Sequence, residues 1–264
     1  MATIVFLHAH PDDESISTGG SIARAVREGH RVVLVVGTNG DHGEAPADLA
    51  VGETVVDRRR KETEASCSVL GIHRLVWLGY SDSGMTGWEQ NNLPNAFINA
   101  DLEEASDRLV AVLDEENADV LVGYDWHGGY GHPDHIMVHR VVHAAGAKRP
   151  SVALWEATMN RDRVRQRMQA AFDAGFIKEE DKWDVDGPAD DGNPFGSLES
   201  EINLMVDVRD LAMTKRESVK CHASQVTDSS FFMSMPMDQF VDAFGWEWYI
   251  KPGDNSPMRE GFIV

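Results

Sequence analysis

The sequence predicts an α/β fold in which helices cover both faces of a doubly wound, mostly parallel β-sheet. Two observations support this prediction. Apolar runs of strand length alternate with helical patterns as far as residue 158, which is the order of right-handed strand–helix–strand units. The run RVVLVVGT at 31–38 is apolar almost throughout, as expected for a strand that a parallel sheet buries on both faces.

Each predicted strand is a short apolar run rich in β-branched or aromatic residues. The first, TIVFLHA, starts close to the N-terminus, and each later one follows a helical pattern. The strands expected in this part of the chain cover residues 3–9, 31–38, 74–80, 119–125 and 151–158.

The segments between these strands carry helix signals. Gly29 and Gly71 follow the first two helical patterns as stop signals, and the third pattern has an apolar stripe from Leu102 to Leu113. The expected helices cover residues 17–30, 57–72, 99–118 and 132–147.

After residue 158 the alternation becomes irregular. A loop at 184–200 contains several glycines and prolines, and its role is not evident from the sequence. We therefore expect one domain over 1–264, with a core at 1–158 and a C-terminal extension at 159–264 packed on it. Within the extension the patterns predict helices at 161–175 and 211–225 and strands at 202–208 and 245–251.

Composition limits the partners. The formal net charge is −20, from 24 basic and 44 acidic residues, which argues against nucleic acid or an anionic membrane as partner. No apolar run approaches the ~20 residues that span a bilayer. The two cysteines, Cys67 and Cys221, agree with a reducing compartment. We expect a cytoplasmic protein that acts on a small molecule. The sequence is compatible with assembly into a homo-oligomer and does not fix the oligomeric state.

Two polar segments follow predicted strands. HAHPDDE at 8–14 follows the first strand, and GGYGHPDHIMVH at 128–139 follows the fourth. Because the carboxyl ends of parallel strands meet at one edge of an open sheet, these distant segments should converge there. Both contain the tripeptide His-Pro-Asp, which predicts a shared chemical site.

The residue types at this edge suit a catalytic metal. Zinc commonly takes three protein N or O ligands and keeps one position for water, whose pKa it lowers to about 7. His10, Asp13 and one histidine of the second segment could supply the ligands, and Asp12 could accept the proton of that water. The second histidine would stabilise an oxyanion or protonate a leaving amine. The residues alone do not decide between His132 and His135.

Neighbouring residues have supporting roles in this interpretation. Asp134 could orient His132 through its ring N–H. His139 and His143 continue the same helical face, where we expect supporting or core groups.

Other functional classes fit less well. His8 and His10 form the H-x-H pair of metal-dependent amidohydrolase barrels, but such a barrel needs eight strand–helix units and about five are recognisable. Glycines at 37, 40 and 43 do not match the dinucleotide-binding spacing, and no G-x-S-x-G elbow is present. A non-catalytic metal- or sugar-binding module is an alternative, although both Asp12 and His132 are present.

With AHPDDE and GHPDH, the chain resembles the LmbE/PIG-L family of zinc-dependent N-deacetylases from about residue 3 to 145. The resemblance implies a Rossmann-like α/β fold and removal of acetyl groups from N-acetylglucosamine units of small conjugates or lipids. It also implies zinc, for which ferrous iron can substitute on similar ligands. The positions that match the family's functional residues are His10, Asp13 and His135 as metal ligands, Asp12 as general base, His132 as oxyanion stabiliser and Asp134 as its partner.

The motifs DSGM at 82–85 and GGYGHPDH at 128–135 resemble the actinobacterial mycothiol branch most. That branch contains a deacetylase of a GlcNAc-inositol and an amidase of mycothiol conjugates. By resemblance, Arg59 and Asp82 contact substrate, and Tyr130 is a mobile tyrosine near the scissile amide. Ser17 replaces a lysine of the amidases, which favours deacetylation over the alternative amidase activity. His222 lies in a segment that resembles the branch, at the pocket border or in the core.

Overall fold

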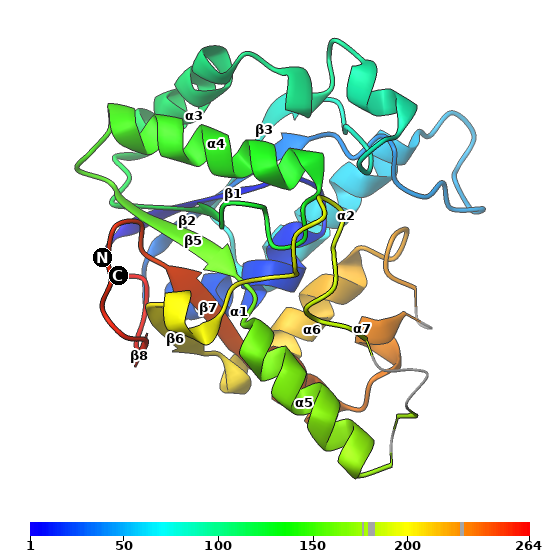
Figure 1. Ribbon diagram of the computed structural model, residues 1–264. Helices are drawn as coiled ribbons and strands as arrows, with labels where there is room; N and C mark the ends of the chain where they lie inside the picture. Colours follow the sequence, from blue (N-terminus) through cyan, green and yellow to red (C-terminus); the bar gives the residue numbers. More distant parts are fainter. Residues whose placement is uncertain (176, 179–182, 228–229) are drawn as a thin grey trace.

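The computed structural model describes residues 1–175, 177–178, 183–227 and 230–264 (Figure 1). In this part of the chain one eight-stranded sheet has the order β3-β2-β1-β4-β5-β7-β6-β8. The first five strands pair in parallel, which confirms the predicted doubly wound core. Their bounds are β1 Thr3–His8, β2 Arg31–Thr38, β3 Arg74–Tyr80, β4 Val120–Tyr124 and β5 Ala153–Thr158.

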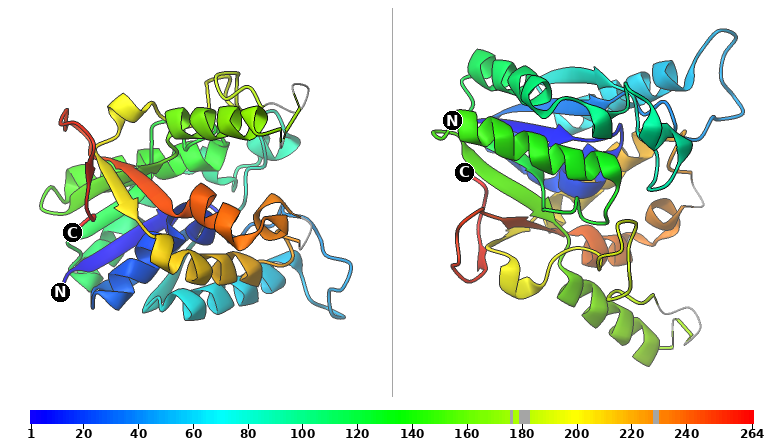
Figure 2. Two further views of the ribbon diagram at one scale, coloured as in Figure 1. Left: turned by 90° about the horizontal axis from the view of Figure 1, so that it is seen from below. Right: turned by 45° about the horizontal axis from the view of Figure 1, so that its top comes forward.

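Helices lie on both faces of the sheet. Helices α3 and α4 pack together on one face, whereas α1, α2 and α6 pack together on the other, as the views of Figures 1 and 2 show. No helix among the described residues is both long and apolar enough to cross a bilayer. The helix bounds are α1 Asp13–Arg27, α2 Val55–Leu70, α3 Leu102–Glu116, α4 Pro133–Lys148, α5 Arg161–Asp173, α6 Ala212–Cys221, α7 Phe231–Ser234 and α8 Met237–Phe244.

The first helix begins four residues earlier than its pattern predicts, at Asp13 instead of residue 17. Asp13 and Glu14 occupy its first turn, where the positive end of the helix dipole stabilises carboxylates. The predicted boundary was wrong because acidic residues were assigned to a loop. Both aspartates of the first motif are therefore held by the rigid strand-to-helix junction.

The C-terminal extension packs on the core and also enlarges its sheet. Strand β7, Trp246–Ile250, pairs antiparallel with β5, and β6, Leu204–Asp207, pairs antiparallel with β7. The short β8, Arg259–Glu260, then pairs in parallel with β6. The sheet is consequently mostly parallel with antiparallel additions. The short β8, α7 and α8 were not predicted from the sequence.

A buried ion pair within the extension also bonds to the first helix of the core. Lys215 Nζ on α6 lies 2.6 Å from Glu247 Oε1 on β7, and both side chains are almost fully buried. The Glu247 carboxylate also accepts hydrogen bonds from the backbone N–H groups of Gly20 and Ser21 in α1. Since these bonds link α1, α6 and β7, the extension is fixed against the helix that begins at the predicted metal site.

Candidate active site

The two His-Pro-Asp segments meet at the carboxyl ends of β1 and β4, as the sequence predicts. Asp13 starts α1 just after β1, and His132 is the N-cap of α4 after β4. The ring centroids of His10 and His132 are 4.6 Å apart, and those of His10 and His135 are 5.3 Å apart. All of these side chains are buried, so the three imidazoles form one compact cluster.

Asp13 connects the two segments. Its Oδ2 lies 3.4 Å from His10 Nδ1 and 3.3 Å from His135 Nε2. Ligand atoms at the corners of a tetrahedral zinc site are about 3.3 Å apart, because the bonds are about 2.0–2.1 Å long. His135 Nδ1–H donates to the Gly128 carbonyl at 3.0 Å, which leaves the Nε2 lone pair toward Asp13. The contacts of Asp13 with His10 and with His135 thus have the spacing of two ligand pairs around a divalent ion.

Further donor atoms surround His10. Its Nε2 faces Asp134 Oδ2 at 3.1 Å and Asp82 Oδ1 at 3.6 Å. Burial alone would lower the pKa of His10, but these carboxylates and Asp13 raise it well above its ordinary value. Two overlapping donor sets lie within 4.8 Å, one of the three histidines and one of His10, Asp82, His132 and Asp134. Neither of these two sets includes Asp13, so the ligand set His10, Asp13 and His135 remains a prediction.

Asp12 is held in an uncommon backbone conformation, with φ 116°. Such strain in a residue other than glycine costs on the order of 1–3 kcal/mol and persists only where neighbours enforce it. Arg59 does so: its Nη2 lies 2.6 Å from the Pro11 carbonyl and 3.3 Å from Asp12 Oδ2, and its Nη1 donates to the Gly40 carbonyl. Burial raises the pKa of Asp12 to about 6, and Arg59 opposes this rise.

His132 is held as a hydrogen-bond donor toward the cluster. Its Nδ1 accepts the backbone N–H of Asp134 at 3.1 Å, so a neutral ring carries its proton on Nε2. Burial, followed by the neighbouring His10 and His135, lowers the pKa of His132 to about 3. The imidazole is therefore neutral near pH 7 and can donate from Nε2.

Asp134 orients His132 through its backbone N–H, which donates to His132 Nδ1, and not through its carboxylate as expected. The Asp134 carboxylate instead accepts from Ser83 N at 2.8 Å and from Ser83 Oγ. The prediction was wrong in this detail because the carboxylate turns away from the N-cap toward the loop after β3. Ser83 was not predicted as a site residue, although it lies in the DSGM motif at 82–85.

The residues expected to contact substrate differ in accessibility. Tyr130 OH lies 3.5 Å from His135 Nε2, beside the cluster. Arg59 is only 4% exposed and lies against Asp12, and Asp82 is buried next to His10. Ser17 is partly buried on α1. Contact of Arg59, Asp82, Tyr130 or Ser17 with substrate remains a prediction.

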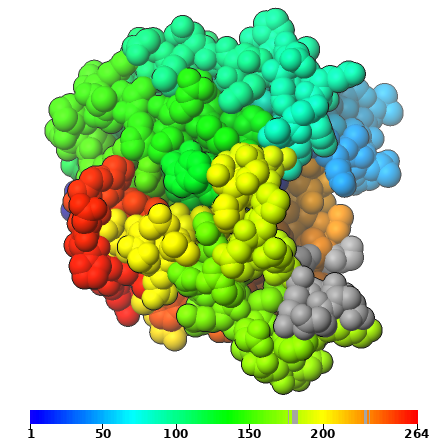
Figure 3. Space-filling view, in the orientation of Figure 1, coloured from blue at the N-terminus to red at the C-terminus, as the bar shows by residue number. Residues whose placement is uncertain are grey.

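The loop at 184–200 packs on the glycine-rich segment that carries Tyr130. Asp190 N donates to the Tyr130 carbonyl at 3.0 Å, and Gly196 N donates to the Gly129 carbonyl at 2.6 Å. The Asp190 carboxylate also accepts from Thr86 N, next to the DSGM motif. In the space-filling view this loop, in yellow, lies on the surface next to the green part of the chain that contains residues 128–131 (Figure 3).

Of the two places expected for His222, the pocket border and the core, the structure shows the core. Its Nε2 lies 2.7 Å from Glu14 Oε1, and both side chains are essentially inaccessible. The pKa of Glu14 would rise on burial, but His222 and hydrogen bonds lower it to about 2. His222 thus supports the residue that follows Asp13. Glu14 was missed as a supporting residue, because its partner is 208 positions away in the chain.

The comparison with known proteins identifies the family. The model of the PIG-L family, described as GlcNAc-PI de-N-acetylase, matches residues 5–146. This chain belongs to the PIG-L family. A 1D-myo-inositol 2-acetamido-2-deoxy-alpha-D-glucopyranoside deacetylase of a Nocardioides species is 34% identical over 97% of this chain and 94% of its own. The protein with the same name in Streptomyces avermitilis is 36% identical over 97% and 94%.

Solved structures share the fold of this PIG-L member at low sequence identity. N,N'-diacetylchitobiose deacetylase from Pyrococcus horikoshii is similar with a TM-score of 0.57 and 23% identity, over 91% of this chain and 75% of its own. A deacetylase of the teicoplanin biosynthesis pathway gives 0.60 and 16%, over 96% and 100%. GalB, a 4-carboxy-2-hydroxymuconate hydratase of Pseudomonas putida, gives 0.59 and 16%, over 98% and 99%. Since a hydratase shares the fold, the fold alone does not determine the reaction.

The barrel alternative is wrong for this PIG-L fold. The sheet is open, with β3 and β8 as its edge strands in the described residues. His8 is also turned away from the metal cluster, because its Nδ1 pairs with Tyr124 OH at 2.7 Å and its Nε2 with Thr18 Oγ1 at 2.8 Å. His8 is therefore a hydrogen-bonded core histidine.

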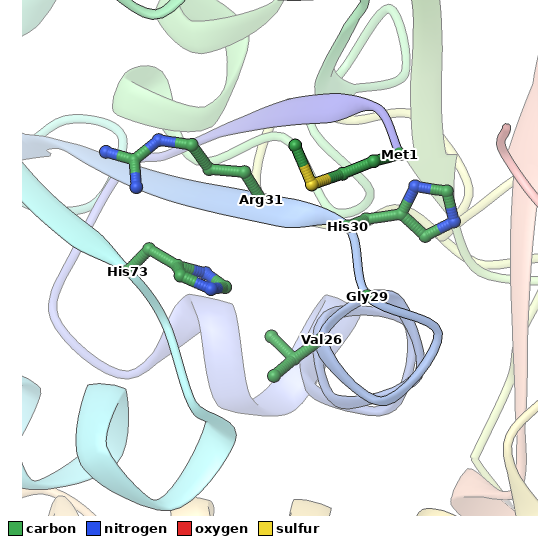
Figure 4. A pocket seen from close by; sticks show the side chains of 6 residues that line it. All are labelled: Met1, Val26, Gly29, His30, Arg31 and His73. Atoms are coloured by element: carbon green, nitrogen blue, oxygen red, sulfur yellow. The ribbon is translucent and has the colours of Figure 1, made fainter.

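A separate cavity of about 270 Å³ lies at the opposite, amino-terminal end of the sheet (Figure 4). Its two histidines are engaged with the backbone: His30 Nδ1 accepts from Ala2 N, and His73 Nδ1 accepts from Val32 N. It shares no residue with the imidazole cluster. Its lining consists of Met1, Val26, Gly29, His30, Arg31 and His73.

Proposed function

We propose that this PIG-L family member is a metal-dependent hydrolase that removes the acetyl group from an N-acetylglucosamine unit of a small conjugate, with a GlcNAc-inositol as substrate. The placement of Asp13 between His10 and His135, with Asp12 beside it, is the observation that carries the proposal. The relatives named as GlcNAc-inositol deacetylases, which match along nearly the whole chain, support the substrate class. A cytoplasmic location is proposed from the sequence.

In this proposal His10, Asp13 and His135 hold Zn²⁺ or Fe²⁺. When bound, such an ion polarises a carbonyl group and makes water acidic enough to react near neutral pH. The donor distances of 3.3 and 3.4 Å at Asp13 suit an ion of this size. Their nitrogen and oxygen donors fit both metals, so the metal used in cells is left to experiment.

Asp12 and His132 divide the proton chemistry. With a pKa of about 6, the Asp12 carboxylate is mostly ionised at neutral pH and accepts a proton from water as its oxygen attacks the acetyl carbon. His132 donates a hydrogen bond from Nε2–H to the carbonyl oxygen as negative charge develops there. Asp12 then returns its proton to the sugar nitrogen, the C–N bond breaks, and acetate and the free amine leave.

The test is acetate release from a GlcNAc-inositol, with a cysteinyl–glucosamine amide assayed in parallel. We expect acetate release that a chelator abolishes and Zn²⁺ restores, which also excludes a non-catalytic binding module. Asp12→Asn should lose about 10²–10⁴-fold in rate, the usual contribution of a general base, and keep its bound metal. His73→Gln, at the other end of the sheet, is the matched control.

Three results would contradict the proposal. Full activity after chelation would exclude a metal-dependent reaction, and full activity of Asp12→Asn would exclude its role as base. Faster cleavage of the cysteinyl amide than of the acetyl amide would make this chain an amidase of the mycothiol-conjugate type.

A further inference from the structure

Helix α4 carries two histidines beyond those of the candidate active site. His139 and His143 are four residues apart, so they lie on one face of the helix, and their ring centroids are 4.3 Å apart. Glu156 on β5 faces both rings from the adjacent sheet. Helix α4 lies across β4 and β5 in Figure 1, which brings these two elements together.

The donor atoms of this group are close enough to share one ion. Glu156 Oε1 is 3.2 Å from His139 Nδ1 and 2.6 Å from His143 Nε2. One donor atom from each of the three residues lies within 4.8 Å of the others. Without an ion, His139 Nδ1–H donates to the Tyr124 carbonyl oxygen at 3.1 Å; an ion on this nitrogen would replace that proton. Two imidazoles and one carboxylate are a ligand set that zinc commonly uses.

The group is also accessible, unlike the active-site cluster. The side chain of His143 is 38% exposed and that of His139 is 20% exposed, while Glu156 is 9% exposed. The Glu156 carboxylate, held by the sheet, thus faces two partly exposed imidazoles. An ion can reach them from solvent and keep water in an open position.

We propose that His139, His143 and Glu156 bind a second divalent transition-metal ion, of the Zn²⁺ type, at a site separate from the candidate active site. The two sites use different turns of α4, since His135 and His139 are about 6 Å apart along the helix axis. Their rings also engage different backbone groups, the Gly128 and the Tyr124 carbonyl. This inference does not depend on the proposed deacetylase reaction.

The competing interpretation is a hydrogen-bonded cluster without metal. In it the Glu156 carboxylate accepts from both rings, which explains the same short distances. Burial by itself lowers the pKa of His139, and Glu156 raises it above the usual value. The two interpretations differ in one measurable respect, because only the metal site binds an additional equivalent of Zn²⁺.

The ion would connect α4 with β5. Because α4 starts with the residues His132 to His135, occupancy should stabilise the helix that carries part of the active site. A ligand that binds only the folded state raises its stability according to concentration and affinity. Added Zn²⁺ should therefore raise the Tm of the holoenzyme, and this rise should require His143.

The experiment measures bound zinc after equilibrium dialysis of the metal-loaded enzyme at a fixed pH near 7.5. We expect two equivalents in the wild type and one in His143→Gln and His139→Gln. Glu156→Gln keeps the shape and loses the charge, so its second Kd should rise at least tenfold. His73→Gln, a histidine outside both groups, should keep two equivalents, and acetate release by His143→Gln should stay near that of wild type.

Each other outcome overturns the inference. A wild-type enzyme with a single equivalent that His143→Gln retains lacks the proposed site. Two equivalents in His143→Gln, or an equal loss in His73→Gln, would place the extra zinc elsewhere on this acidic protein. Titration with Co²⁺ provides an independent readout, since the second increment of visible absorption should disappear in His143→Gln and persist in His73→Gln.

Discussion

Replacing Arg59 tests whether this side chain tunes Asp12 or contacts substrate. Its Nη2 lies 3.3 Å from Asp12 Oδ2 in a buried environment, and an arginine at such a distance lowers the pKa of a carboxyl group by about 1–3 units. Arg59→Met removes this effect. The pKa of Asp12, which is about 6 with Arg59 present, should therefore rise by a similar amount.

The effect on rate follows from the ionised fraction of Asp12. A base with a pKa of about 6 is roughly 90% ionised at pH 7, and a rise of about 1–3 units reduces this to roughly 50% to 1%. The value of kcat/KM at pH 7 should thus fall about 2- to 100-fold. Because the ionised form is active, activity is lost as the pH falls through the pKa, and the variant should lose it at a higher pH. A bound metal ion lowers the pKa of Asp12 in the wild type and in Arg59→Met alike. The measured quantity is therefore the difference between the Asp12 pKa values of the two enzymes.

The assay is amine release from a GlcNAc-inositol from about pH 5 to 9, the range in which the acid limb of the profile reports this group. Arg59→Lys keeps the charge and is the matched control, so its acid limb should stay closer to that of wild type. An unchanged acid limb in Arg59→Met, together with a raised KM, would refute the tuning role. That result would instead support the substrate contact predicted from the family resemblance.

Two further predictions concern stability. Lys215→Met should lower the free energy of unfolding by about 3–5 kcal/mol, because Glu247 stays buried without a countercharge. The Tm should fall by roughly 6–10 °C. A urea unfolding curve equal to that of wild type would contradict a stabilising role of the buried pair. Gly20→Ala should cost about 1–3 kcal/mol, because its Cβ would lie 2.5 Å from Val208 Cγ2. Gly146→Ala, whose Cβ would lie 3.5 Å from Leu154 Cδ2, should be neutral or stabilising in the same measurement, and equal losses in both variants would argue against the tight contact.

The parallel sheet and the convergence of the two motifs were predictable for a local reason. Apolar runs of strand length alternating with helical patterns impose a parallel sheet, and parallel strands end at one edge. His10 and His135 therefore had to approach each other, although 125 positions separate them. The pairing of β7 with β5 was not predictable in this way, because an isolated apolar run does not encode the direction in which it joins a sheet.

Side-chain partners were the least predictable feature of the site. The contact of Arg59 and Asp82 with substrate stays a prediction, and the structure adds partners that were not foreseen: Asp12 for Arg59 and His10 for Asp82. The spacing of residues along a helix gives a face, whereas the partner on that face depends on which other segments pack there. Ser83 and Glu14 were missed for the same reason, since their contacts come from segments far away in the chain.

The sequence by itself determined the sheet core and the family, and it predicted metal chemistry for the two His-Pro-Asp segments. These properties depend on local periodicity and on residue types at strand ends, which are written in consecutive positions. Only the tertiary structure decided that His222 supports Glu14, that the segment at 184–200 packs on the chain around Tyr130, and that Glu156 meets His139 and His143. Each of these contacts joins segments whose separate patterns carry no information about one another, so packing alone brings them together.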